Sequence, residues 1–302
     1  MPENLFKLNQ KEFILPGTRA CSGCGLSLAY RYILKALREN TIVIVPPSCL
    51  CVLHGLYPTT SVMIPCLNSA FAGSAASASG VLAALQTLNK QDITVVAVAG
   101  DGGTHDIGLQ SLSAAAERGT DFIYVCYDNE AYMNTGTQRS GATPYGAMTT
   151  TTPILLKQQH KKDIPRIMEA HDIAYIATVS PSYPIDLYDK FVKAKKIKGT
   201  RYIQVLTPCP PGWGYAPKDT VKIGRAAVET GMSPLYEIEN GKFRFTDRSK
   251  TIAEKGTRLP MIKYIEKQGR FQKMSIEQLN QLQSWVDTKW DEYVRRNKKS
   301  RN

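Results

Sequence analysis

Oxygen-bearing side chains follow two apolar runs of the sequence, at the point where each run ends. The run Ile93–Ala99 leads directly into Gly100-Asp101-Gly102-Gly103, and a second run, Phe122–Tyr127, leads into Asp128-Asn129. Two buried strands joined by a helix lie parallel in one sheet, and their carboxyl ends meet at the same edge. We therefore expect Asp101 and Asn129 to lie side by side, although 28 positions separate them.

A carboxylate and an amide oxygen at one sheet edge suit Mg²⁺. With nearby backbone carbonyls they provide a few protein ligands and leave the other positions of the ion to diphosphate oxygens. Gly100, Gly102 and Gly103 let the backbone approach a phosphate and present N–H groups to it at a helix start. The pattern, Gly-Asp-Gly followed by 26 residues and then Asn129, resembles the thiamine diphosphate fingerprint. The alternative at this point is an α/β crossover with a glycine-rich turn and no nucleotide.

Four cysteines fall at expected loops or strand ends and form a second candidate site. Cys21 and Cys24 make a CxxC pair, Cys49 comes 25 residues after the pair, and Cys209 comes late in the chain. Cys49 and Cys209 each follow an expected strand, so they can converge on one site. Four thiolates suit Zn²⁺ or an iron–sulfur cluster equally well, and their spacing does not choose between the two.

The other three cysteines are interpreted differently. Cys66 and Cys126 are expected to be buried as small hydrophobic side chains. Cys51 lies two residues after Cys49 and would face the opposite side of an extended backbone, so Cys49 is preferred as the ligand. Among the four isolated histidines, His105 lies in the glycine-rich turn, but packing or surface roles are favoured for all of them.

Expected strands and helices alternate along most of the chain, which predicts an α/β fold with a doubly wound, mostly parallel sheet. Residues 1–216 would form the cofactor-binding domain and residues 217–302 a C-terminal extension or arm that packs on partner subunits. Thr137–Pro153 is expected to be an active-site loop or subunit contact. The helix after Asp101 would bury one face. The residues available for that face are Ile107, Leu109, Leu112 and Ala116.

Composition indicates a folded, soluble protein. The chain has 302 residues, of which 43% are hydrophobic, and a net charge of +12. The basic residues are spread out and lack an aromatic-interleaved recognition pattern, so a solvated surface is favoured over nucleic-acid binding. The polar N-terminus resembles no secretion signal, and no apolar run approaches the roughly 20 residues that a membrane span needs. A cytoplasmic location is therefore expected.

The two motifs together resemble one family, the β subunits of the 2-oxoacid:ferredoxin oxidoreductases, most closely the pyruvate synthase type. The family's CxGC pair, its third cysteine and its TxCPxGW-like segment correspond here to Cys21, Cys24, Cys49 and Cys209. These four would hold a 4Fe–4S cluster close to the thiamine. The second motif reads GDGGTHDIGLQSLS and YDNEAYMNTGTQRSGATPYG in this sequence. The resemblance covers about residues 15–215 and is weaker in ETGMSPLYEIENG and KYIEKQGRF.

The resemblance also implies the residues that would hold thiamine diphosphate. Asp101, Asn129 and the backbone carbonyl of Ala131 would ligate Mg²⁺ on the diphosphate. Asn134 would be a catalytic residue that faces the thiazolium ring and the substrate, where its amide can hydrogen-bond a reacting oxygen. Thr135 beside it would contact the cofactor. The glycines that would admit the phosphates are Gly100, Gly102 and Gly103.

The implied activity is oxidative decarboxylation of a 2-oxoacid, with pyruvate as the first candidate. Electrons would pass through the cluster to ferredoxin, and coenzyme A would usually take the acyl group. An α subunit would provide the glutamate that activates the thiamine ring and much of the substrate pocket, and γ and δ subunits would carry further clusters. No glutamate of this chain is placed by a motif for that role, and Glu130 is interpreted as local structure.

Departures from the family pattern lie near the expected cofactor pocket. Relatives of the pyruvate type often read ATGC before the third cysteine and carry a glutamate two residues after it, where this chain has Pro46-Pro47-Ser48-Cys49 and Cys51. The family's AFEN segment reads Ala70-Phe71-Ala72-Gly73. Oxalate, 2-oxoglutarate and branched-chain 2-oxoacids are therefore alternative substrates. Two other classes also stay open: a non-redox thiamine diphosphate decarboxylase or ligase, and a zinc-stabilised subunit without catalytic activity.

Overall fold

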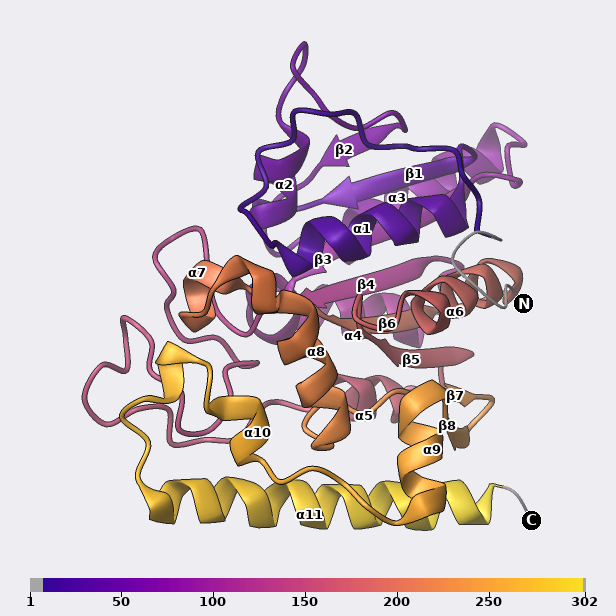
Figure 1. Ribbon diagram of the computed structural model, residues 1–302. Helices are drawn as coiled ribbons and strands as arrows, with labels where there is room; N and C mark the ends of the chain where they lie inside the picture. Colours follow the sequence, from indigo (N-terminus) through magenta and orange to yellow (C-terminus); the bar gives the residue numbers. More distant parts are fainter. Residues whose placement is uncertain (1–7, 301–302) are drawn as a thin grey trace.

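The computed structural model describes residues 8–300, and in this part of the chain one sheet holds eight strands. Their order is β2-β1-β3-β4-β6-β5-β7-β8. The first six strands in this order lie parallel, whereas β7 is antiparallel to β5 and β8 is antiparallel to β7. Helices cover both faces of the sheet (Figure 1). The predicted doubly wound, mostly parallel α/β fold is confirmed.

The strands of the described residues are β1 (Thr41–Val45), β2 (Cys66–Asn68), β3 (Thr94–Gly100), β4 (Ile123–Asp128), β5 (Tyr175–Val179), β6 (Arg201–Leu206), β7 (Tyr236–Glu239) and β8 (Lys242–Phe245). The α-helices are α1 (Gly25–Leu37), α2 (Cys49–His54), α3 (Ser74–Thr87), α4 (Leu109–Glu117), α5 (Ile164–Glu169), α6 (Pro184–Lys196), α7 (Pro210–Trp213), α8 (Thr220–Glu229), α9 (Asp247–Lys255), α10 (Ile262–Ile265) and α11 (Ile276–Lys299). Shorter helical turns are η2 (Gly102–Asp106), η3 (Pro217–Asp219) and η4 (Gly269–Phe271).

Side chains alternate along the strands and so form two cores, one on each face of the sheet. In β1, Val43 and Val45 face one core and Ile44 faces the other. Helices α1 and α6 cover the first core and lie in front of the sheet in Figure 1, whereas α3 and α4 cover the second core behind it. A third core lies among α8, α10 and α11, next to the loops at the carboxyl ends of the strands.

The unit from β3 to β4 positions the predicted metal ligands. These strands pair in parallel with Gly100 opposite Tyr127, so the residues that follow them leave the sheet together. The predicted helix between them is interrupted: the π-helical turn η2 comes first and α4 follows. Ile107 lies in the break and is 48% exposed, so its predicted place on the inner face is wrong. Leu112 and Ala116 are buried as predicted.

The segment after residue 217 shares one sheet and one core with the rest of the chain. The hairpin β7–β8 extends the main sheet, and α11 runs along the lower edge of the molecule in Figure 1 with Trp290 in the second core. This segment therefore packs on the chain's own sheet. Its contact with partner subunits stays a prediction.

No helix within residues 8–300 is long and apolar enough to cross a membrane. The cytoplasmic location stays a prediction. Residues 1–7, part of the polar N-terminus on which the absence of a secretion signal was predicted, lie outside the described residues.

Phe243 tests whether the C-terminal segment belongs to the folding unit. Its ring is 1% exposed and stacks on Tyr293 of α11 at 5.4 Å between centroids. We expect Phe243→Ala to lower the free energy of unfolding by about 3–5 kcal/mol, because it leaves a cavity between the sheet and α11. Urea unfolding of the purified protein measures the change. The control is Ile276→Ala, at a side chain that is 80% exposed. A Phe243→Ala variant as stable as this control would contradict the prediction.

Candidate active site at the carboxyl edge of the sheet

Three oxygen-bearing groups converge where β3 and β4 end. The terminal atom of the Asn129 amide that faces Asp101 lies 2.9 Å from Asp101 Oδ1 and 2.9 Å from the backbone oxygen of Ala131. With the amide oxygen in this place, three oxygens face one another with no hydrogen-bond donor among them. A nitrogen in the same place would donate to both neighbours, since the two ends of an amide are assigned from their partners.

In this oxygen cluster (Asp101 Oδ1, Asn129 Oδ1 and Ala131 O), the two distances from Asn129 fit the spacing of ligands around an octahedral cation. Ligands at right angles around a Mg²⁺–O length of 2.0–2.1 Å lie about 2.9 Å apart. Glu130, between two of the ligands, has the left-handed φ of 69°. This backbone turn sets the side chain of Asn129 and the carbonyl of Ala131 toward Asp101. The side-by-side placement of Asp101 and Asn129 predicted from the sequence is confirmed.

Asp101 is held in place by the loop predicted to be part of the site. Ser140 Oγ, within Thr137–Pro153, donates to Asp101 Oδ2 at 2.5 Å. Asp101 is 1% exposed, and burial, together with the neighbouring Asp128 carboxylate, raises its pKa well above the ordinary value. A cation beside it would offset this penalty, so the donor set suits a divalent metal.

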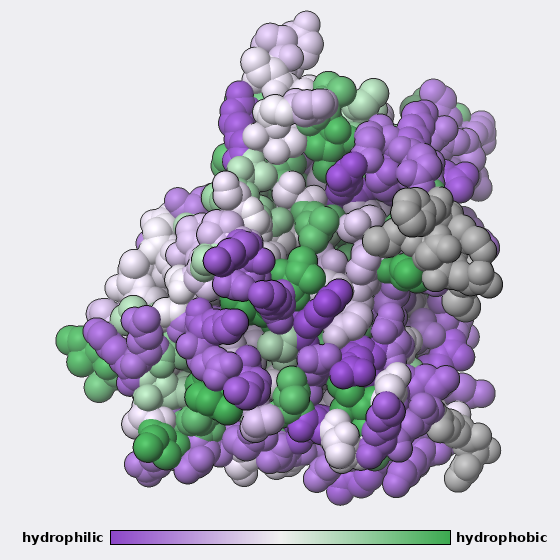
Figure 2. All heavy atoms as spheres, in the orientation of Figure 1, coloured by the Kyte–Doolittle hydropathy of each residue, from purple (hydrophilic) through white to green (hydrophobic). Residues whose placement is uncertain are grey.

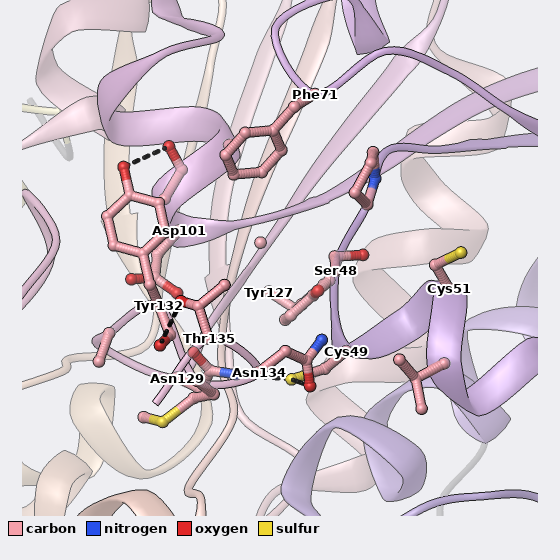
Figure 3. A pocket seen from close by; sticks show the side chains of 17 residues that line it. Ser48, Cys49, Cys51, Phe71, Asp101, Tyr127, Asn129, Tyr132, Asn134 and Thr135 are labelled. Atoms are coloured by element: carbon pink, nitrogen blue, oxygen red, sulfur yellow. Dashed lines mark hydrogen bonds between the residues drawn. The ribbon is translucent and has the colours of Figure 1, made fainter. Parts of the chain in front are cut away.

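A cavity of about 450 Å³, here called the cofactor cavity, opens beside the oxygen cluster. Gly100, Gly102 and Gly103 form part of its wall, and Asn134 and Thr135 lie on the same wall as Asn129. The close-up in Figure 3 shows Asn129, Asn134 and Cys49 side by side along one rim, with Phe71 on the opposite side. Every residue predicted to hold the cofactor therefore reaches this cavity.

Close packing limits the space at these glycines, most severely at Gly102. A Cβ at Gly102 would collide with the ring of Tyr132, and a Cβ at Gly103 would lie 3.3 Å from the ring of Phe71. Phe71 and Tyr132 line the cofactor cavity and pack edge to face at 6.3 Å between ring centroids. Sequence reasoning missed Tyr132 as a wall of the cavity because its contact with Gly102 joins segments 30 residues apart.

The four predicted ligand cysteines line a second cavity of about 180 Å³, here called the thiol cavity. Cys49 begins α2 after β1, Cys209 precedes α7 after β6, and Cys21 lies in the loop before α1. Cys24 caps α1, its Sγ accepting from the backbone N–H of Ser27 at 3.4 Å. The structure thus brings all four to one place. No group of three or more His, Cys, Asp or Glu side chains within residues 8–300 is arranged to hold a single metal ion.

The cofactor cavity and the thiol cavity share one wall. Cys49, Val52, Asn129, Met133 and Asn134 line both of them. Cys49 Sγ lies 3.3 Å from Asn134 Oδ1 and 3.8 Å from Asn129 Nδ2. A group in one cavity is therefore separated from a group in the other by single side chains.

Three of these thiols, those of Cys24, Cys49 and Cys209, are unfavourable as thiolates without a cation. Burial, together with charge repulsion from Cys209, Cys24 and Asp101, raises the pKa of Cys49 to about 12. Burial is also the main cause that raises the pKa of Cys209 to about 11. Thiolates are the form that binds metal. Iron in the thiol cavity would balance these charges, so the residues present fit an iron–sulfur group.

Two predictions about the remaining cysteines, those for Cys66 and Cys51, are wrong. Cys126 is buried as predicted, but Cys66 is exposed at the start of the edge strand β2 and lies 3.4 Å from His54 Nδ1. Cys51 lies in α2 rather than in extended backbone, so it faces the cofactor cavity instead of pointing away from it. It does not line the thiol cavity. His105 is buried, which lowers its pKa to about 3 and makes it a neutral packing residue at neutral pH.

Sequence reasoning missed a buried ion network behind the oxygen cluster. Glu130 is 1% exposed and pairs with Lys161 at 2.6 Å and with Arg270 at 2.6 Å, and Lys161 also pairs with Asp128 at 2.8 Å. The interpretation of Glu130 as local structure agrees with these contacts. Arg270 carried no motif, because the segment around it is only weakly similar to the family.

Comparison with known protein families identifies the domain that carries the site. A family model of the thiamine pyrophosphate enzyme C-terminal TPP-binding domain matches residues 49–205. This range includes Cys49 and the whole of the oxygen cluster. The fold and the site thus define a thiamine-diphosphate-binding α/β domain.

Two relatives identify the family, and one solved structure has a similar fold. The chain is 48% identical over 286 residues to pyruvate synthase subunit PorB of Methanothermobacter thermautotrophicus, covering 93% of this chain and 97% of the relative. It is 44% identical over 290 residues to ketoisovalerate oxidoreductase subunit VorB of Pyrococcus horikoshii, covering 93% and 92%. The fold is similar to the 2-oxoglutarate:ferredoxin oxidoreductase of Magnetococcus marinus, with a TM-score of 0.58 and 18% identity over 74% of this chain and 84% of that one. The chain belongs to the PorB/VorB β subunits of the 2-oxoacid:ferredoxin oxidoreductases.

Gly102 tests the fit of the cofactor cavity. We expect Gly102→Ala to weaken Mg²⁺-dependent thiamine diphosphate binding at least tenfold, because the new methyl group must displace Tyr132 from the cavity wall. Titration calorimetry of the purified complex measures the affinity. The control is Gly80→Ala in α3, where a Cβ has nothing within 4 Å and helix propensity improves by roughly 0.5–1 kcal/mol. Equal affinities for the two variants would be the contrary result.

Proposed function

We propose that this chain is the thiamine- and cluster-binding subunit of an enzyme that oxidatively decarboxylates a 2-oxoacid. The substrate would lose its carboxylate as CO₂, its acyl group would join the sulfur of coenzyme A, and two electrons would leave one at a time for ferredoxin. Pyruvate is the first candidate, because several of the relatives are pyruvate synthase subunits. A branched-chain 2-oxoacid is the second, because other relatives are ketoisovalerate oxidoreductase subunits.

The shared wall between the two cavities is the observation that carries this proposal. Thiamine diphosphate supplies a ring that accepts the electron pair left by decarboxylation, and a 4Fe–4S cluster supplies a one-electron outlet for it. With Asp101, Asn129 and the Ala131 carbonyl holding Mg²⁺ and the diphosphate, the thiol cavity lies directly behind Cys49. Electron transfer then crosses only side chains of this subunit.

The chain's own residues would orient the reacting groups. Gly102 and Gly103 leave room for phosphate, and Phe71 and Tyr132 provide an apolar wall that excludes water. Asn134 lies where the two cavities meet, so its amide N–H is placed to donate to a reacting oxygen of the substrate. Ser140 fixes the orientation of the Asp101 carboxylate through its hydrogen bond.

A partner α subunit would complete the site. Among the described residues, no glutamate lines the cofactor cavity, which supports an activating carboxylate from another chain. The neighbouring surface carries large exposed apolar side chains, among them Val52 in the cavity wall and Leu56 and Met63 on the loop that protrudes above α2 in Figure 1. Figure 2 shows hydrophobic residues gathered below this protrusion. Burial of this surface by a partner would close the cavity. Further clusters on γ and δ subunits would carry electrons to ferredoxin.

The departures from the family pattern bear on the substrate. Ser48 and Cys51 both line the cofactor cavity, so the changes around the third cysteine face this cavity, whereas Ala72 and Gly73 are not among its lining residues. The part of the cavity wall that this chain supplies carries no lysine or arginine among its described residues, so it offers no partner for the second carboxylate of 2-oxoglutarate.

Cys209 tests the cluster assignment. In the complex purified without oxygen, we expect Cys209→Ser to lose most of the cluster absorbance near 400 nm and most of the iron, because one of four ligands is missing. Thiamine diphosphate binding should remain, since Cys209 does not line the cofactor cavity. Cys66→Ser is the matched control and should keep its iron. A colourless wild-type complex containing zinc would instead support a structural zinc subunit, and an unchanged cluster in Cys209→Ser would refute the ligand assignment.

Viologen reduction tests the reaction and the substrate together. The purified complex should reduce the dye with pyruvate or a branched-chain 2-oxoacid and slow sharply when coenzyme A is left out. Turnover should be at least tenfold lower with 2-oxoglutarate, because no cation in the cavity wall pairs with its second carboxylate. Decarboxylation without dye reduction would indicate the non-redox alternative. Fastest turnover with oxalate or 2-oxoglutarate would overturn the substrate assignment.

A further inference from the structure

The buried ion network behind the oxygen cluster ends in one residue that no motif assigns. Arg270 lies in η4 of the C-terminal segment, and its side chain is 4% exposed. Its guanidinium pairs with Glu130 at 2.6 Å, donates to Gln268 Oε1 at 2.9 Å and to the Tyr264 hydroxyl at 3.0 Å. It also stacks over the ring of Trp213 at 3.8 Å. A carboxylate, two polar side chains and an aromatic ring therefore hold this cation.

The first set of contacts reaches the metal ligands. Glu130 stands between Asn129 and Ala131 with a left-handed backbone, a conformation that a residue other than glycine keeps only when its surroundings hold it. Its carboxylate is held by Arg270 on one oxygen and by Lys161 on the other. Loss of either cation would release the turn that aims Asn129 and the Ala131 carbonyl at Asp101.

The second set of contacts reaches the loop of the fourth cysteine. Trp213, beneath the guanidinium, donates from its ring nitrogen to the backbone oxygen of Asn129 at 2.7 Å. Its own backbone N–H bonds to the carbonyl of Cys209 at 2.9 Å. Gly269, next to Arg270, donates to the carbonyl of Gly214 at 3.0 Å, which ties η4 to the end of α7. The guanidinium of Arg270 thus reaches the Cys209 loop through the ring of Trp213.

From these contacts we propose that Arg270 is a positioning residue. It fixes the position of the metal-binding turn at Asn129–Ala131 relative to the loop that carries Cys209. It does so through Glu130 on one side and Trp213 on the other. The C-terminal segment, which the sequence marks as an appended arm, thereby contributes to the electron-transfer site. This inference rests on the proposed function, because it assumes Mg²⁺-diphosphate at the oxygen cluster and a cluster at the four cysteines.

Two substitutions separate the geometric role of Arg270 from its charge. In the complete complex, Arg270→Met should weaken Mg²⁺-dependent thiamine diphosphate binding roughly 10- to 100-fold, the usual effect of removing a group that orients metal ligands. It should also shift the cluster's reduction potential to a more negative value, because a nearby cation stabilises the reduced form. Arg270→Lys keeps the charge but cannot pair with Glu130 and stack on Trp213 at once. It should weaken binding and leave the potential close to wild type.

Two further variants make the test decisive. Trp213→Phe removes the N–H that Asn129 accepts from and keeps a ring beneath Arg270, so binding should weaken while the potential stays near wild type. Arg258→Met is the matched control: Arg258 pairs with Asp287 and lies over the ring of Trp290 at 5.2 Å, away from both cavities. It should change melting temperature alone.

Calorimetry and electron paramagnetic resonance redox titration give the two readouts. Wild-type affinity and potential in Arg270→Met would overturn the proposal. If that variant does not fold, wild-type affinity in both Arg270→Lys and Trp213→Phe would do so instead. A wild-type complex with no cluster signal or no thiamine diphosphate binding is a different result, since it contradicts the proposed function itself.

Discussion

The site depends on the close approach of the Asn129 amide to two oxygens, Asp101 Oδ1 and the Ala131 carbonyl, each at 2.9 Å, at the carboxyl edge of the sheet. Oxygens this close, in a place where Asp101 is 1% exposed, repel one another unless a cation or a donor lies among them. The protein holds them together with rigid elements on every side. The parallel pairing of β3 and β4 sets Asp101 beside Asn129, and the Glu130 turn adds the Ala131 carbonyl. A divalent metal with a diphosphate would satisfy this arrangement.

The same edge also explains why the cysteines gather there. Cys49 follows β1 and Cys209 follows β6, strands that flank β3 and β4 in the sheet. Because all four strands are parallel, their ends open toward one face of the molecule, and the two cavities come to share a wall. Under the proposed function, the decarboxylation and the removal of its electrons would both take place within this one subunit. The β7–β8 hairpin extends this sheet, and α11 packs in the second and third cores.

Much of the fold and of the candidate site could be predicted from the sequence, because the patterns that indicate them each lie within a short stretch of residues. Alternating strands and helices, the turn after β3 and the CxxC pair each lie within a short segment. Ile107 was misplaced because a π-helical turn interrupts the expected helix, and hydrophobic spacing does not register such a break. The exposure of Cys66 follows from its position on the edge strand β2, which only the strand order reveals. Arg270 was missed because Glu130 and Trp213, the two partners that connect it to the site, lie more than 50 residues away.

The closeness of the metal site and the cluster is the central claim, and magnetic coupling tests it most directly. Mn²⁺ accepts the same oxygen ligands as Mg²⁺ and is paramagnetic. In the complex reduced without oxygen, Mn²⁺ with thiamine diphosphate should broaden the cluster's electron paramagnetic resonance signal and speed its relaxation, and Asp101→Ala should abolish the effect. A cluster signal that stays unchanged while Mn²⁺ is bound at the oxygen cluster would contradict the account.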